Sequence, residues 1–373
     1  MECKCPLHAI TKILQEASDI ITDRNFLNIY SHAVLKIDGD ILSIYASDSI
    51  IHTYNSMHVE GIENGTTAIH AARMLSVLKS ITESVVHLRF ENNAMIIKGI
   101  GAKQTQARFE LKTIEASEFQ TVPELTDGLS IEIRTQTLLA LISKSIISVL
   151  TDDTRVFLTG VYFTQENGIL HIVATDGKRL SIVKDPTIQI PSDFTGKILP
   201  VKMLKFIQKH GNTDDIATLT VYDRFFSVVI GDGLRIIAPH IEGQFPDYKR
   251  VIPETQTNHI RIDRQECIQA LKKASLFAEL SKKVLFHIQS NKIHIHANDN
   301  NFGKAEEYIS TEYSGEDVLF GFNHKYLLDP LLVEESKNVK ISFTDPQKVV
   351  TITPDEEQTM QSYHIIMPMK VHL

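Results

Sequence analysis

The stretch Leu170-His171-Ile172-Val173-Ala174-Thr175-Asp176-Gly177-Lys178-Arg179-Leu180 decides the fold of this chain. Apolar residues dominate it up to Ala174, which predicts a strand, and Asp176-Gly177 then predicts a tight turn. Two related stretches, 42–48 and 293–299, have the same form, apolar-polar-apolar-X-Ala-(Ser/Thr/Asn)-Asp. Asp176 follows Asp48 by 128 positions, and Asp299 follows Asp176 by 123, in a chain of 373 residues. The spacing indicates an internal repeat of about 124 residues, a third of the chain.

Each third of the chain also predicts two amphipathic helices, because its apolar residues recur at three- and four-residue spacing. We expect first helices over 9–18, 137–149 and 266–277, and second helices over 72–79, 201–207 and 325–331. Pro330 is expected to kink or shorten the last of these. Short alternating runs lie between the helices and are separated by turn signals such as Asn64-Gly65, Asn167-Gly168 and Asp232-Gly233, which is typical of antiparallel meanders.

The repeat predicts an α+β chain of three tandem domains, each with two helices packed on antiparallel sheet. Short polar segments near Asp127-Gly128 and at 255–258 follow the related stretches 121–124 and 251–254. We place the domain boundaries there, which gives domains at 1–127, 128–254 and 255–373.

Composition is that of an ordinary globular protein, with 43% apolar and 23% charged residues. No apolar run approaches the ~20 residues that span a membrane, and the first residues lack the apolar core of a signal peptide. We therefore expect a cytoplasmic protein. Cys3 and Cys5 have no nearby Cys or His pair with which to form a zinc site, so a frayed, reduced terminus is expected there. Cys267 lies in a helical pattern and is expected in the core.

No catalytic constellation is visible in the sequence. The Gly-x-x-x-x-Gly-Lys-Ser/Thr phosphate loop is absent, and none of the 16 histidines has His-Glu-x-x-His spacing. His294 and His296 lie two apart on one strand and could in principle bind a metal, but ordinary strand residues are the better interpretation. We predict no catalytic residue, no cofactor and no metal, which favours a structural or binding role.

Positive charge is concentrated on the predicted helices. The net charge of −8 argues against a protein that simply coats nucleic acid. Yet basic residues outnumber acidic ones on these helices, with Lys12, Arg73, Lys79, Lys144, Lys202, Lys205, Lys209, Lys272, Lys273 and Lys325. If the helices share one side, that side could hold a polyanion through phosphate contacts. Solvated helix faces are the alternative interpretation.

Three motifs together resemble the bacterial sliding clamps, the DNA polymerase III beta subunits. They are Val173 to Leu180, Phe245 to Pro253, and Ile366 to Lys370; Gly321-Phe322-Asn323, followed by Tyr326, is similar to a further stretch of that family. The resemblance covers the whole chain. It implies three copies of one domain per chain, two chains joined head to tail in a closed ring, helices lining the hole, and no enzymatic activity.

The resemblance also implies functional residues. A partner-peptide cleft is expected at Leu158, Thr175, Gly177, Lys178, Arg179, Leu180, Pro246, Arg250, Val251, Tyr326, Ile365, Met367, Pro368 and Met369. The resemblance places Arg24, Arg73 and Lys202 toward DNA, and the helical charges add Lys79, Lys144 and Lys205. This chain departs from the family pattern near 347–349, in the extension 370–373, and at Val156-Phe157, where some members have two tyrosines.

The sequence thus predicts a homodimeric sliding clamp that encircles duplex DNA without base specificity. Its expected partners are a clamp loader, the replicative DNA polymerase and repair proteins, bound through short linear peptide motifs, with no membrane partner and a cytoplasmic, nucleoid-associated location. An interaction scaffold that uses the same cleft without encircling DNA is the competing hypothesis. A nucleic-acid enzyme is a distant third, since no catalytic cluster supports it.

Overall fold

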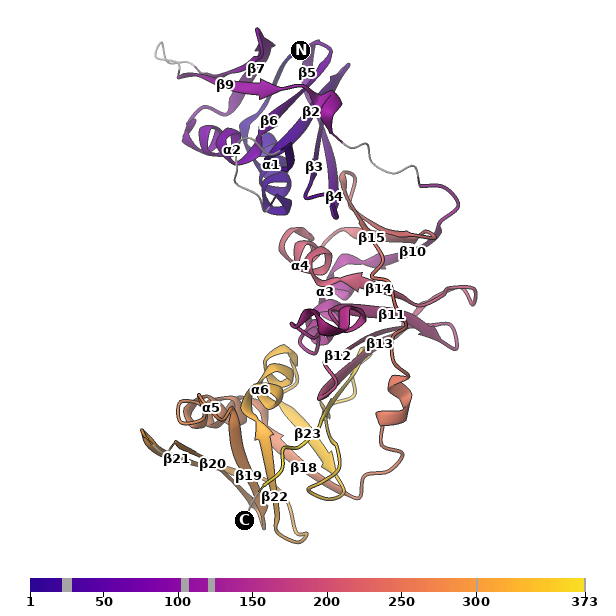
Figure 1. The fold of residues 1–373 in the computed structure, drawn as a ribbon, viewed down its shortest axis with the longest axis vertical. Helices are drawn as coiled ribbons and strands as arrows, with labels where there is room; N and C mark the ends of the chain where they lie inside the picture. Colours follow the sequence, from indigo (N-terminus) through magenta and orange to yellow (C-terminus); the bar gives the residue numbers. More distant parts are fainter. Residues whose placement is uncertain (22–28, 102–106, 120–124, 300, 372–373) are drawn as a thin grey trace. The chain divides into compact units, whose positions relative to one another are not determined.

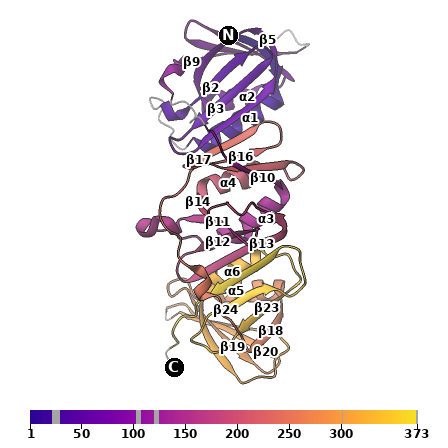
Figure 2. The same cartoon turned by 90° about the vertical axis from the view of Figure 1, so that its right-hand side faces the viewer.

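The computed structural model describes residues 1–21, 29–101, 107–119, 125–299 and 301–371. These residues form two compact units, Met1–Leu139 with Lys202–His240, and Ala140–Val201 with Ile241–Leu373. Figures 1 and 2 show the ribbon from two directions. The helices of the described residues are α1 (Leu7–Ile20), α2 (Ala71–Ser80), α3 (Thr135–Ile146), α4 (Val201–His210), α5 (Arg264–Ser275) and α6 (His324–Val333), with short 3-10 turns η1 (Ile29–Ser31), η2 (Ala116–Glu118), η3 (Asp153–Leu158) and η4 (Tyr248–Val251).

The first unit is built on one antiparallel sheet of 13 strands within the described ranges. In spatial order its strands are β10 (Leu129–Arg134), β15 (Ile216–Val221), β16 (Phe225–Ile230), β17 (Leu234–Pro239), β4 (His52–His58), β3 (Ile41–Ser47), β2 (His32–Asp38), β6 (Gly65–His70), β9 (Arg108–Ile114), β8 (Ala94–Ile100), β7 (Val85–Glu91), β1 (Glu2–Pro6) and β5 (Glu60–Glu63). Helices α1 and α2 pack side by side, and α1 also contacts β3 and β4 (Figure 1). Their apolar faces bury Leu14, Met74 and Leu78 in the core.

The second unit contains two antiparallel sheets among the described residues. One has the order β14 (Lys197–Pro200), β11 (Gly160–Glu166), β12 (Ile169–Thr175), β13 (Arg179–Gln189), β25 (Gln361–Ile366), β24 (Val350–Pro354), β23 (Asn338–Phe343) and β18 (Asn258–Asp263). The other has the order β21 (Gly303–Ser310), β20 (Lys292–Asp299), β19 (Lys283–Gln289) and β22 (Val318–Asn323). Helices α5 and α6 lie together, and α5 contacts β20 and β21 (Figure 1).

Strands of the middle repeat extend the sheets of both neighbouring repeats. In the first unit β17 pairs with β4, with Ile236 opposite Thr53. In the second unit β13 pairs with β25, with Leu180 opposite Ile365. The predicted antiparallel meanders with two helices per third are confirmed, but the compact units divide the middle repeat because its strands join two different sheets.

The aspartates that revealed the repeat make the same turn in all three thirds. Asp48 Oδ1 accepts hydrogen bonds from the backbone N–H groups two and three residues ahead, at 3.0 and 2.7 Å. Asp176 Oδ1 does the same at 2.8 and 3.0 Å, and Asp299 Oδ1 at 2.8 and 3.2 Å. Such side-chain-to-backbone bonds fix a tight turn locally, so the repeated aspartate is a structural signal.

Two local expectations are wrong. Helix α6 continues through Pro330 to Val333. It has 10 residues, the same length as α2 and α4, so Pro330 does not shorten it. The first residues are not frayed, because β1 pairs with both β5 and β7 and buries Cys3 and Cys5. Cys267 lies in the core as predicted, 1% exposed.

A buried polar cluster joins α3, α6 and β25 in the second unit. The ammonium of Lys144 donates to Glu334 Oε2 at 2.7 Å, and Ser362 Oγ donates to Glu334 Oε1 at 2.5 Å. His364 Nε2 lies 3.0 Å from the same Oε1, and its Nδ1 lies 2.9 Å from Ser181 Oγ. Burial alone would raise the pKa of Glu334, but His364 and Lys144 outweigh burial and lower it to about 2. The carboxylate is therefore charged at neutral pH.

We predict that Lys144→Ala lowers the free energy of unfolding of the second unit by about 3–5 kcal/mol, because it leaves the Glu334 carboxylate buried without its cation. Denaturant titration of the full chain measures this loss. Lys205→Ala is the matched control: Lys205 is an exposed helical lysine, and its change should lie within about 0.5 kcal/mol. Equal effects of the two substitutions would contradict the prediction.

The stability difference between wild type and Lys144→Ala should also depend on pH. The folded-state pKa of Glu334 lies below the usual 4.5, so the ionised carboxylate contributes stability above that value and loses it as pH falls toward 2. We expect the difference to be constant at neutral pH and to narrow between about pH 4.5 and 2. Denaturant titrations across this range measure it, and a difference that stays constant down to pH 2 would argue against the ion pair.

Candidate functional site: an apolar cleft beside the Asp176 turn

A cleft of about 370 Å³ opens in the second unit beside the Asp176 turn. Its apolar floor is buried, with Leu158, Leu180 and Ile365 each 2–3% exposed, whereas Val251 and Met367 at its rim are 49% and 54% exposed. Its lining consists of Arg155, Phe157, Leu158, Thr175, Gly177, Lys178, Arg179, Leu180, Pro246, Asp247, Tyr248, Val251, Val349, Ile365 and Met367. A mostly apolar hollow with a few polar groups is typical of a binding site.

The pairing of β13 with β25 brings the two walls of the cleft together. It sets Arg179 opposite Ile366 and Leu180 opposite Ile365. The chain after β25 is then held beside the turn, because Met367 N–H donates to the carbonyl of Lys178 at 2.9 Å. Residues that are nearly 190 positions apart in sequence therefore form one surface.

The turn itself is rigidly held. Gly177 has a φ of +87°, a conformation that glycine adopts without strain, and a Cβ there would lie 3.1 Å from Arg155 Nη1. Thr175 Oγ1 donates to the carbonyl of Arg179 at 2.6 Å, and Gly177 N–H donates to Thr175 Oγ1 at 3.1 Å. Arg155 Nη2 donates to the carbonyl of Asp176 at 3.0 Å and closes the turn from the other side.

The buried side chain of Arg179 forms ion pairs with two aspartates beside the cleft. Its Nε donates to Asp176 Oδ2 at 3.1 Å, and its Nη1 donates to Asp329 Oδ2 of α6 at 2.7 Å. The guanidinium also lies 4.5 Å from the ring centroid of Tyr326, a cation–π contact. The guanidinium is thus used to join the turn to α6, which leaves Lys178 as the cation of this turn at the cleft.

Ten of the predicted cleft residues line this one hollow, and four do not. Arg250 is 83% exposed and binds Asp247 through Nε at 2.9 Å, while Tyr326 lies under Arg179. Pro368 and Met369 continue past the cleft, where Met369 N–H donates to the carbonyl of Gly321 at 2.7 Å. These four remain predicted cleft residues without a place in the lining.

Sequence reasoning missed four residues of the lining, Arg155, Phe157, Asp247 and Tyr248, and it reached Val349 only within the altered stretch 347–349. Asp247 and Tyr248 belong to the quoted motif Phe245 to Pro253, so a fuller reading of that motif could have found them. Burial raises the pKa of Tyr248 to about 12, with Glu166 adding to the effect, so its hydroxyl stays neutral. Arg155 and Phe157 come from η3, the segment that also supplies the predicted Leu158, so the neighbours of Leu158 were a signal for them.

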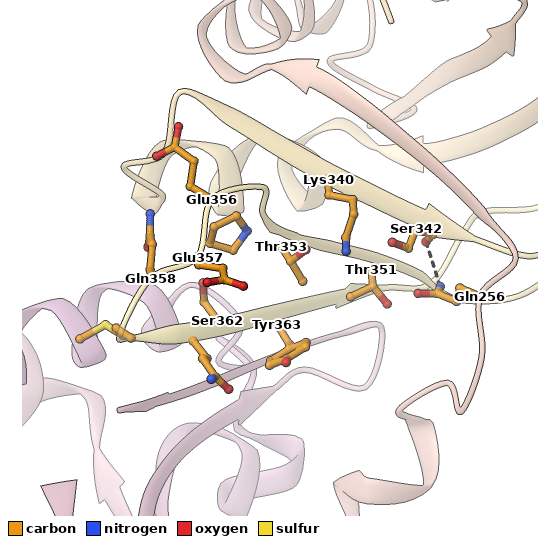
Figure 3. A pocket seen from close by; sticks show the side chains of 13 residues that line it. Gln256, Lys340, Ser342, Thr351, Thr353, Glu356, Glu357, Gln358, Ser362 and Tyr363 are labelled. Atoms are coloured by element: carbon orange, nitrogen blue, oxygen red, sulfur yellow. Dashed lines mark hydrogen bonds between the residues drawn. The ribbon is translucent and has the colours of Figure 1, made fainter. Parts of the chain in front are cut away.

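A second hollow in this unit, of about 500 Å³, is polar. Figure 3 shows Lys340 of β23 and Glu357 of the loop before β25 on either side of Thr353, with Gln256 bonded to the carbonyl of Ser342 at 2.8 Å. Side-chain amides, hydroxyls and opposite charges make up most of its lining, and its less polar residues are Pro354, Met360 and Tyr363. The larger hollow is therefore the poorer site for a short apolar segment.

The predicted DNA-binding residues differ in accessibility. Arg73, Lys79 and Lys205 are exposed on α2 and α4. The ammonium of Lys202 binds Asp48 Oδ2 and the carbonyl of Ile20, so it is already engaged within the first unit. These four remain predictions, and Arg24 lies outside the described residues.

For Lys144 the prediction is wrong. Its side chain is 6% exposed and its ammonium is bound by Glu334, so it is not available to contact a phosphate. An amphipathic pattern cannot reveal a partner 190 positions away.

Other chemistry finds no support in the described residues. They contain no group of three or more metal-ligating side chains, and His294 and His296 instead stack with ring centroids 4.5 Å apart. No described helix is both long enough and apolar enough to cross a membrane.

Comparison with known families matches the three repeats one by one. The N-terminal domain of the DNA polymerase III beta subunit matches residues 1–123, its central domain residues 132–247, and its C-terminal domain residues 249–370. The fold and cleft thus define a sliding-clamp protein. The chain belongs to the DNA polymerase III beta subunit family.

Relatives of known name match this chain over nearly its full length. The beta sliding clamp of Treponema pallidum is 30% identical and that of Haemophilus influenzae 27%, with 99% and 97% of this chain and 100% and 98% of theirs covered. A crystal structure of the Pseudomonas aeruginosa sliding clamp bound to griselimycin matches with a TM-score of 0.92 at 26% identity and covers both chains completely. The chain is accordingly a sliding clamp of DNA replication, a non-catalytic processivity subunit.

Proposed function

We propose that two copies of the chain join head to tail into a ring around duplex DNA, and that the cleft binds short segments of partner proteins. The replicative polymerase, repair proteins and the clamp loader are the partners, and the cytoplasm, at the nucleoid, is the location. The repeats are bounded at 1–127, 128–254 and 255–373. The observation that carries the proposal is the apolar cleft with its exposed rim, in a chain of this family.

The cleft suits a short extended or helical segment with two or three apolar side chains. The buried floor of Leu158, Leu180 and Ile365 would receive the anchors, and the rim residues Val251 and Met367 would close over them. Methionine is unbranched and flexible, so such a rim accommodates different partners. Lys178 at the same edge favours a segment that carries a carboxylate.

DNA retention would come from topology, aided by uniform contacts. Three repeats in one chain leave the first and third without a neighbour on one side, and a second copy completes the ring. Exposed cations such as Lys79 and Lys205 would contact phosphates, which repeat along the duplex and carry no sequence information. A ring with such contacts can slide without leaving the DNA.

We predict that the protein, once loaded on a circular duplex, is retained through gel filtration and lost when a restriction enzyme cuts the circle, because a closed ring can leave only over an end. The measurement is the amount of protein that co-elutes with DNA before and after cutting. A circle without the restriction site is the control. Equal retention on cut and uncut DNA would contradict encirclement and favour the scaffold hypothesis.

We predict that Met367→Ala weakens binding of a synthetic peptide carrying the clamp-binding segment of the replicative polymerase by about 1–3 kcal/mol, because it removes an anchor contact at the rim. Calorimetric titration measures the affinity. Met360→Ala is the matched control, since Met360 lines the second hollow and not the cleft, and it should change affinity by less than about 0.5 kcal/mol. Equal losses in the two variants would place the peptide outside the cleft.

A further inference from the structure

The cleft and the polar hollow of Figure 3 lie on one face of the same sheet. In antiparallel strands, residues directly opposite each other project to the same face. Leu180 of β13 lies opposite Ile365 of β25, and both belong to the floor of the cleft. Ile365 lies in turn opposite Thr351 of β24, and Thr351 opposite Ser342 of β23; the two polar residues line the hollow. One row of side chains therefore leads across four strands from the cleft into the hollow.

Alternate residues along two of these strands connect the cleft and the hollow as well, because every second side chain of a strand points to the same face. Val349, directly before β24, lines the cleft, and Thr351 and Thr353 line the hollow. On β25, Ile365 lines the cleft and Tyr363 lines the hollow. A chain that leaves the cleft beside these strands therefore enters the hollow next.

Two polar groups at the hollow lack a partner of their own. Thr351 is only 7% exposed, and its Oγ1 has no hydrogen-bond partner in the described part of the chain. A buried hydroxyl without a partner is costly, so a ligand that accepts a hydrogen bond from it gains affinity. Lys340 is exposed on β23 and forms no ion pair among the described residues, whereas Arg261 opposite it binds Asp355, with Nε 2.7 Å from Oδ2. An available ammonium and a hydroxyl donor on neighbouring strands suit a carboxylate.

The acidic residues of the hollow stand apart from these donors. Glu356 and Glu357 belong to the exposed loop between β24 and β25, and Figure 3 shows Glu357 and Lys340 on either side of Thr353. Lys340 is instead held on the sheet, directly opposite Thr353. Lys178 is the cation at the cleft. One cation at the cleft and another at the hollow favour a partner segment that carries negative charge.

We infer that the hollow binds the polar flank of the partner segment whose apolar side chains occupy the cleft, and that Lys340 and the Thr351 hydroxyl receive an acidic side chain of that flank. This inference rests on the proposed binding of partner segments in the cleft and adds a charge-dependent part to it. Neighbouring strands lie about 4.8 Å apart, so Lys340, two strands and two residues from Ile365, is about 12 Å from the cleft floor. An extended chain covers this span in about three or four residues, which sets the separation between the last apolar anchor and the acidic residue.

Peptides with and without a charged flank test the inference on the full chain. The probes are the clamp-binding segment of the replicative polymerase alone, and the same segment extended at either end by three serines and a glutamate or by three serines and a lysine. Calorimetric titration measures each affinity. For the wild type we expect the better-placed glutamate extension to bind about three- to tenfold tighter than the matching lysine extension. Lys340→Glu should reverse this order and leave the affinity of the unextended segment within about twofold.

Two further variants separate the parts of the site. Lys337→Glu is the matched control, since Lys337 is an exposed lysine directly before β23 and outside the lining, and it should keep the preference for the glutamate extension. Thr351→Val removes the hydroxyl and leaves the charges in place. It should reduce the preference about two- to threefold without lowering the melting temperature, because the hydroxyl has no partner in the protein alone.

The outcomes distinguish the flank from the cleft. Equal affinities for the two extensions in the wild type, or a tighter lysine extension, would overturn the flank site while the unextended segment still binds the cleft. A preference that persists unchanged in Lys340→Glu would overturn it as well. A wild type that does not bind the unextended segment would instead overturn the proposed function of the cleft, and the flank site with it.

Discussion

One carboxylate geometry recurs in each third of the chain, and the arrangement of each junction depends on it. One oxygen of Asp48, Asp176 or Asp299 is used within the turn, on two backbone N–H groups. The other oxygen is thereby left for a cation. In the first case it meets Lys202, 154 positions away, and in the second it holds Arg179 of the same turn, whose Nη1 binds Asp329 of α6. A local turn thus fixes a long-range contact without any further sequence signal.

Electrostatics at these turns follows from that geometry. Burial would raise the pKa of Asp48, but Lys202 and the two N–H groups of the turn together lower it. The Asp48 carboxylate is charged at neutral pH, and its stabilising contribution is lost as pH falls below the usual pKa of an aspartate. The Lys144–Glu334 pair is buried and costly to separate, whereas the Lys202 side chain is 36% exposed, so solvent weakens the Asp48 pair. Apolar packing supplies most of the stability, and these pairs select the arrangement.

The repeat and the helices were predictable because they rest on local patterns. Helix bounds differ from those expected by a few residues, and Leu14, Leu141 and Leu271 are all buried. The sharing of strands between repeats was not predictable, since edge pairing such as β13 with β25 leaves no periodicity. For the same reason, motif residues such as Leu180 were found in the lining, whereas Arg155, which tertiary structure brings there, was missed. The prediction that Lys144 contacts DNA failed for a similar reason, because helical periodicity gives the face on which a residue lies but not what covers that face.

The residues that follow each aspartate decide what its turn becomes. After Asp48 come Ser49, Ile50 and Ile51; Ile50 is 55% exposed and Ile51 1%, and the second oxygen of Asp48 binds Lys202 of α4. After Asp176 come Gly177, Lys178 and Arg179. Gly177 leaves room beside Arg155. Arg179 binds Asp329 of α6, and Lys178 lies at the cleft.

After Asp299 the described residues are Asn301 and Phe302, and Phe302 is 77% exposed. Exposed apolar side chains of this size mark an interaction surface. Divergence at two or three positions per repeat is thus enough to turn one supersecondary unit into an internal joint, a binding cleft and an open end.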